Sequence, residues 1–329
     1  MMTTPPENPV EAKQEGETMP DRRAAKPQLS PEVEPNEMSA EWGKVEPAYR
    51  NLQALFAESA VVTLAPNNKQ FEAFNQHFIV ENEQLTIGCI DERCKHEGHG
   101  LNIGLGGAGI LIPKEQFDQY VAFIVHTAIN KKVKHIVINA HEGCGAAKLS
   151  LGKADATNVD VKDHALQFAR KLQAAVAQAI PGINVVEKLV SSAEMMAPEL
   201  NHNAVGATVD LTGEFDAARM SDTEANDLPP MFNVNGQFDF EHAVANVGVA
   251  LSIAFGGHGF GAERFSADRP FLIVVVLKQG VDHTSFVARL QVAAQAFVQN
   301  YNTQSMAQLG AGALQITDEF VVVKAVLKP

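Results

Sequence analysis

Two short stretches of the 329-residue chain contain the residue types that most often carry chemistry in enzymes. One reads LTIGCIDERCKHEGHG and places Cys89, Asp91 and Arg93 at alternate positions. The other, HIVINAHEGCGAAK, places His141 three residues before Cys144. Two thiolates and one imidazole are a ligand set for Zn²⁺, with a fourth tetrahedral position left for water or a carboxylate. The sequence therefore predicts a zinc site.

Both motifs follow a predicted strand, one over residues 84–89 and the other over 133–140. Between them, residues 114–133 have apolar side chains at spacings of three and four, which is typical of a helix packed on a sheet. A helix that connects two parallel strands brings their carboxyl ends side by side, where open α/β sheets bind ligands. This arrangement would allow Cys89 to meet His141 and Cys144.

Strands and helices alternate along the rest of the chain and predict an α/β fold, with a mostly parallel sheet flanked by helices. Further helices are expected over residues 39–60, 71–80, 163–180, 238–255 and 284–301, and further strands over 184–192, within 204–215, and over 269–277 and 319–327. The second half faintly echoes the first, which leaves open a degenerate, cysteine-free repeat. We therefore expect a tail over 1–40, a zinc-binding catalytic domain over 41–190 and a second α/β lobe over 191–329.

Composition excludes several classes of protein. A formal net charge of −13 argues against general nucleic-acid binding, which needs clustered Lys and Arg. No apolar segment of a secretory signal is present, and the apolar runs are shorter than the roughly 20 residues of a membrane helix. An odd number of cysteines fits a reducing compartment, so we expect a cytoplasmic protein. The acidic, proline-rich residues 1–40 are expected to be disordered and could dock an unknown partner.

The motifs Cys-x-Asp-x-Arg and His-x-x-Cys-Gly, each after a strand, resemble those of the β-class carbonic anhydrases, of which this chain would be a divergent member. The resemblance implies that Cys89, His141 and Cys144 bind zinc. It implies that Asp91 and Arg93 form a catalytic dyad, in which Asp91 orients zinc-bound hydroxide or itself becomes the fourth ligand. The implied reaction is the reversible hydration of CO₂ to bicarbonate. The family also implies a homodimer or, if the second lobe is a repeat, a pseudo-dimer within one chain.

Two other functions fit the same residues. A hydrolase of a CO₂-like molecule such as CS₂ or COS would use the same ligands and differ in access to the pocket. A non-catalytic protein could use zinc only to hold its fold together, because structural zinc sites have four strong ligands.

Some neighbouring features have more than one interpretation. Cys94, His96 and His99 could form a second metal site or supply an alternative ligand. Alternatively, Cys94 packs as a small apolar side chain, and the two histidines line the mouth of the site, where one could shuttle protons. The stretch GLGGAG over 104–109 matches G-x-G-x-x-G, but its distance from the strand over 84–89 favours a backbone turn near the metal over a dinucleotide site.

Overall fold

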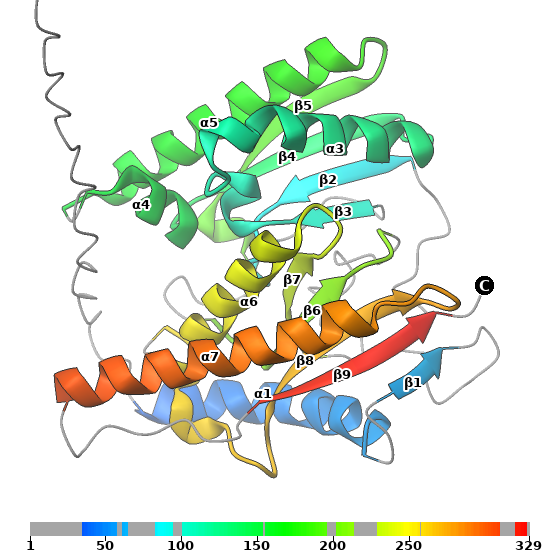
Figure 1. Ribbon diagram of the computed structural model, residues 1–329. Coiled ribbons are helices and arrows are strands. Elements are labelled where there is room, and N and C mark those ends of the chain that lie inside the picture. The colour runs from blue at the N-terminus through cyan, green and yellow to red at the C-terminus, as the bar shows by residue number, and fades with distance from the viewer. Residues whose placement is uncertain are drawn as a thin grey trace, which may run out of the picture.

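The computed structural model describes residues 35–57, 61–64, 83–94, 101–153, 155–195, 202–213, 229–256, 258–309 and 320–327. Over these residues the chain is an α/β protein with two parallel sheets flanked by helices (Figure 1). The helix expected over 71–80 and most of the tail expected over 1–40 lie outside the described residues. Helix α1 (Pro35–Leu55) begins within the range predicted as tail.

The first sheet carries both motifs. Its four parallel strands lie in the order β3 (Leu101–Gly104), β2 (Gln84–Gly88), β4 (His135–His141) and β5 (Asn184–Val190). Its helices are α3 (Phe117–Asn130), α4 (Gly145–Leu151) and α5 (Asn158–Ala179). Helix α5 begins at a capping box, because Thr157 Oγ1 accepts a hydrogen bond from Asp160 N at 3.2 Å and Asp160 Oδ2 accepts one from Thr157 N at 2.9 Å. We call this sheet and its helices the first lobe.

The second sheet is built from both ends of the described chain. Its five parallel strands lie in the order β1 (Val61–Leu64), β9 (Phe320–Leu327), β8 (Phe271–Lys278), β6 (Gly206–Asp210) and β7 (Phe232–Asn235). Helices α6 (Phe240–Phe255) and α7 (Thr284–Leu309) pack against each other beside it, in yellow and orange in Figure 1. We call this second sheet, with α1, α6 and α7, the second lobe.

Short 3₁₀ turns connect some of these elements in both lobes. They span Gly106–Gly109, Lys114–Gln116, Ser192–Glu194 and Ala262–Arg264.

The two sheets repeat one arrangement of strands. Taken in chain order, β2, β3, β4 and β5 occupy the same relative positions as β6, β7, β8 and β9. The registers also agree, because one row across each sheet has the same three residue types: Asn102, Thr86 and Val137 in the first, and Asn233, Thr208 and Val274 in the second. These rows give a residue-by-residue correspondence between the lobes.

The lobes meet where edge strand β3 lies against edge strand β7, and we call this contact the seam. Asn233 Nδ2 donates a hydrogen bond to Asn102 Oδ1 across the seam at 2.6 Å, and Asn233 N donates to Ile90 O at 3.1 Å. A Cβ atom at Gly104 would lie 2.1 Å from the carbonyl oxygen of Asn233, so only glycine fits there. Each edge strand therefore covers the other, which removes two exposed strand edges.

Helix α1 packs against the rest of the second lobe, although the sequence predicted it as part of the zinc-binding domain. The Tyr49 hydroxyl donates a hydrogen bond to Pro270 O at 2.8 Å, and the Trp42 ring meets Phe260 edge-on, with centroids 4.9 Å apart. Strand β1 joins the same lobe because β9 offers it a free parallel edge. The start of the predicted domain over 41–190 thus adds to the second sheet.

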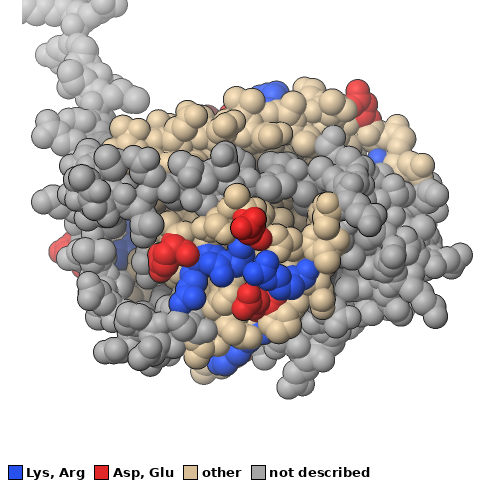
Figure 2. All heavy atoms as spheres, turned by 90° about the horizontal axis from the view of Figure 1, so that it is seen from below, with Lys and Arg blue, Asp and Glu red and all other residues tan. Residues whose placement is uncertain are grey.

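Charges of both signs lie on the exposed side of α1. Arg50 Nη2 lies 3.4 Å from Glu46 Oε1, and Lys44 pairs with Glu41. The view from below in Figure 2 likewise shows Lys and Arg beside Asp and Glu. The described part of this face is therefore mixed in charge.

Most of the helices and strands expected from the sequence are confirmed. The helices expected over 114–133, 163–180, 238–255 and 284–301 are α3, α5, α6 and α7, and the expected strands are β2, β4, β5, β6, β8 and β9. Strand β1, helix α4 and strands β3 and β7 were not predicted. The four-residue patterns of β3 and β7, LNIG and FNVN, are short and contain Asn, which is uncommon in strands. No described helix has both the length and the apolar character needed to span a membrane.

Candidate metal centre

The two motifs meet at the carboxyl edge of the first sheet. Cys89 follows the last residue of β2, and His141 is the last residue of β4. Because these strands are parallel neighbours, their ends lie side by side. The predicted juxtaposition of the two motifs is therefore what the fold produces.

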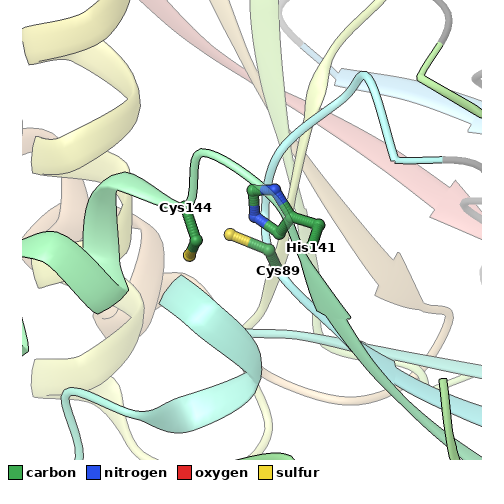
Figure 3. A group of neighbouring side chains, drawn as sticks. All are labelled: Cys89, His141 and Cys144. Atoms are coloured by element: carbon green, nitrogen blue, oxygen red, sulfur yellow. The ribbon is translucent and has the colours of Figure 1, made fainter. Parts of the chain in front are cut away.

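Cys89, His141 and Cys144 form a buried cluster (Figure 3). Each offers one ligand atom, and the three atoms lie within 4.8 Å of one another. Cys144 can join the cluster because Gly143, with φ of 68°, turns the chain directly before it. Zn–S bonds of about 2.3 Å place two sulfurs about 3.8 Å apart in a tetrahedral site. The three side chains therefore fit a single ion after small adjustments.

The ring of His141 is oriented for a metal. Its Nδ1 atom lies 2.9 Å from the carbonyl oxygen of Glu142, a contact that places the ring proton on Nδ1. Its Nε2 atom is buried and has no hydrogen-bond partner among the described residues. A buried polar atom without a partner costs stability, whereas a metal ion would use its lone pair. The orientation of this nitrogen therefore fits a metal at the cluster.

The thiol of Cys89 is held in its protonated form when no metal is present. A hydrogen bond with Cys144 and burial both raise the pKa of Cys89 well above its usual value. A metal ion binds thiolate, so it must displace this proton. Metal binding at the cluster would therefore be coupled to proton release.

Asp91 and Arg93 form a buried bidentate ion pair. Arg93 Nε donates to Asp91 Oδ1 at 2.9 Å, and Arg93 Nη2 donates to Asp91 Oδ2 at 2.7 Å. Burial raises the pKa of Asp91, but nearby His202 and the Arg93 guanidinium outweigh it and hold the pKa well below its usual range. Asp91 is therefore ionised and fixed in one orientation.

Asp91 lies beside the Cys–His–Cys cluster. Its Oδ2 atom is 3.9 Å from His141 Nε2, and Asp91, Cys94 and His141 form a second group of possible ligand atoms within 4.8 Å of one another. Asp91 is thus close to the cluster without belonging to the group of Cys89, His141 and Cys144. Its role as the fourth metal ligand stays a prediction.

Cys94 is buried, as expected for a small apolar side chain, and burial raises its pKa to about 11. Its sulfur also lies in the second group, next to His141, so the interpretation of Cys94 as an alternative ligand stays open. His96 and His99 lie outside the described residues.

A backbone turn completes one side of the cluster. Gly107 N donates a hydrogen bond to Cys89 Sγ at 3.2 Å, which confirms that GLGGAG is a turn beside the Cys–His–Cys cluster. One reason given for that interpretation is wrong, because β3 ends at Gly104, so a strand does precede the turn directly. The turn still opens no α-helix, since α3 begins at Phe117.

The second lobe contributes side chains that were not predicted from the sequence. Asn246 Oδ1 accepts a hydrogen bond from Gly106 N at 2.7 Å. His202 Nδ1 lies 2.9 Å from Glu92 Oε2 and 3.7 Å from Asp91 Oδ1. The sequence offers one signal for this role, which is the position of Asn246 as an amide within the apolar helix FEHAVANVGVALSIAF.

Comparisons with known proteins do not place the chain in a family. No family model matches it, and no curated protein matches its sequence. The resemblance to the β-class carbonic anhydrases therefore rests on the two motifs and on a compatible structure. That structure is a parallel α/β fold with a buried cluster of Cys, His and Asp that could hold a metal ion.

Proposed function

We propose that this protein is a zinc enzyme that catalyses the reversible hydration of CO₂ to bicarbonate. The observation that carries the proposal is the buried cluster of Cys89, His141 and Cys144 with the Asp91–Arg93 ion pair at its side. The three cluster residues would hold the ion. When bound, zinc would supply hydroxide at neutral pH by acidifying water.

Asp91 would orient the attacking oxygen. Its ionised carboxylate can accept a hydrogen bond at Oδ2, the oxygen that lies 3.9 Å from His141 Nε2 and hence on the side of the cluster. Arg93 would keep that carboxylate ionised and hold its rotamer through the bidentate contact. Arg93 N also donates to Asp91 Oδ1 at 3.0 Å, which fixes the carboxylate from the main chain.

The surroundings suit a small, uncharged substrate. The cluster residues, Asp91 and Arg93 are all buried, so a substrate must leave bulk water to reach them. This costs little for CO₂, which carries no charge. Exclusion of water also strengthens the electrostatic contacts that act on the developing bicarbonate.

A structural zinc site is the second candidate. The observation that favours it is Cys94, a third buried sulfur whose distance to a ring nitrogen of His141 is within 4.8 Å. If Cys94 moved toward the cluster, three sulfurs and one imidazole would close the metal and leave no position for water.

A stopped-flow CO₂ hydration assay on protein of measured zinc content tests the proposal. We expect a rate above that of buffer for the wild type and for Cys94→Ser, both with full zinc. Full zinc occupancy without any rate above buffer would leave the structural role as the better account. Faster turnover of CS₂ than of CO₂ would instead identify a hydrolase on the same residues.

A further inference from the structure

We propose that Asn246 of the second lobe is a positioning residue for Cys89. The inference rests on the proposed metal centre and adds to it a part for the lobe that has no cysteine. Asn246 would act through the turn at Gly106 and Gly107, without touching the metal or the substrate.

A chain of two hydrogen bonds connects the lobes at this point. Asn246 Oδ1 accepts from Gly106 N at 2.7 Å, and the next amide, Gly107 N, donates to Cys89 Sγ at 3.2 Å. The Asn246 amide is itself oriented, because its Nδ2 donates to His242 O at 2.7 Å within α6. The side-chain oxygen is therefore directed at the turn.

The turn has little freedom where it meets the cysteines. Gly107 has φ of 58°, and a Cβ atom there would lie 2.6 Å from Ile110 Cγ2 and 3.4 Å from Cys144 Sγ. The turn thus lies against both sulfur ligands. A displacement of Gly106 would move the Gly107 amide relative to Cys89, because the two residues share one peptide group.

The chemical effect would be on the thiolate. An amide N–H that points at a metal-bound thiolate stabilises its negative charge and lowers the charge that it donates to the ion. Two thiolates donate much charge to zinc. A hydrogen bond to one of them would therefore favour acidification of water at the metal.

The first lobe provides a comparison for Asn246. The start of α3, FDQYVAF, aligns with the start of α6, FEHAVAN, so Phe123 is the counterpart of Asn246. Phe123 also crosses to the other lobe, where its ring lies 5.4 Å from that of Phe238 in the segment after β7. The contact of Phe123 is apolar and reaches the lobe without cysteines. The contact of Asn246 is polar and reaches the turn beside Cys89. This difference ties the asparagine to the metal centre.

The test uses cobalt-substituted and zinc-loaded full-length protein. Asn246→Ala removes the acceptor for Gly106 N, Asn246→Asp keeps an acceptor oxygen, and Phe123→Leu is the matched control at the counterpart position. The readouts are the thiolate-to-cobalt charge-transfer absorption and the zinc affinity from competition with a chromogenic chelator. If Asn246→Ala does not fold, Asn246→Ser is assessed by the same criteria.

We expect Asn246→Ala to shift the charge-transfer band and to weaken zinc binding by about tenfold, as for other groups that orient metal ligands. Asn246→Asp should retain most of the wild-type band, and Phe123→Leu should retain all of it. A wild-type spectrum and affinity in Asn246→Ala would overturn the inference, as would an equal shift in Phe123→Leu. A wild-type protein that binds neither metal would overturn the metal centre together with it.

Discussion

The carboxyl ends of corresponding strands carry different side chains in the two lobes. Counted from the matched rows, Leu211 stands in the second lobe where Cys89 stands in the first. Likewise, Lys278 stands in place of His141, and Val281 in place of Cys144. The second lobe therefore keeps the strand order and lacks every proposed zinc ligand.

The backbone before the third ligand is nevertheless alike. Gly143 precedes Cys144 with φ of 68°, and Gly280 precedes Val281 with φ of 84°. A turn of this shape thus forms with or without a sulfur after it. The comparison teaches that side chains, and not the fold alone, decide whether a metal site can form at this edge of a sheet.

The largest effect, on zinc content and stability, is expected from removing a proposed zinc ligand from the first lobe, because the second lobe has no such ligand at the matching position. Cys144→Ser should reduce zinc content to background and destabilise the protein, because metal binding energy contributes to folding energy. Metal analysis and thermal unfolding would measure this. Val281→Ser, the matched change in the second lobe, should leave zinc content unchanged. Stoichiometric zinc in Cys144→Ser would show that the ligand assignment is wrong.

Asp91→Asn should separate metal binding from catalysis. By position its counterpart is Gly213, which has no side chain. We expect the variant to retain zinc and to lose CO₂ hydration by about 10- to 100-fold, the usual effect of removing a group that orients a metal site. An unchanged hydration rate at full zinc content would remove Asp91 from the mechanism.

Zinc affinity should depend on pH, because zinc binds thiolate and must displace the thiol proton. The cysteines all belong to the first lobe. The hydrogen bond with Cys144 and burial raise the pKa of Cys89. Below that pKa, each zinc ion that binds displaces the proton of the Cys89 thiol. For one displaced proton, the zinc affinity should rise about tenfold per pH unit. The increase should stop once pH exceeds the pKa of Cys89. Calorimetry in buffers of different ionisation enthalpy would count the protons. Equal affinity across the neutral range would contradict a protonated Cys89.

The smallest expected effect concerns the symmetry of the seam. Asn102 and Asn233 are counterparts that bond to each other, so Asn102→Leu and Asn233→Leu should not be additive. We expect a coupling of about 1 kcal/mol in the free energy of unfolding, the range for residues in direct contact. Urea denaturation of both single variants and the double variant measures it. If the two changes in the free energy of unfolding are additive, the Asn102–Asn233 hydrogen bond does not stabilise the contact between the lobes.

The sequence was sufficient to predict what depends on local pattern. The run VKHIVINA is too short and too rich in β-branched residues for a helix, which predicts a buried strand, and the spacing in α3 predicts a helix against a sheet. Together they place Cys89 near His141. The interpretation of GLGGAG as a backbone turn is also confirmed, by the 3₁₀ turn over Gly106–Gly109.

Contacts between the lobes could not be predicted in this way. Asn246 and His202 reach the first lobe across the seam, and nothing in a single sequence states which helix will lie against which loop. The short strands β3 and β7 that form the seam have weak patterns because each has only four residues, of which one or two are asparagine. Cross-lobe pairing therefore emerges only from the tertiary structure.

The closeness of Gly104 to Asn233 has a consequence for any attempt to divide the protein. A truncated form ending after β5 would bare the whole edge of β3, with its unpaired amides and carbonyls, to solvent. Such an edge recruits strands from other molecules, so the isolated half would tend to self-associate. The cysteine-free half thus shields an edge that the other half could not leave bare.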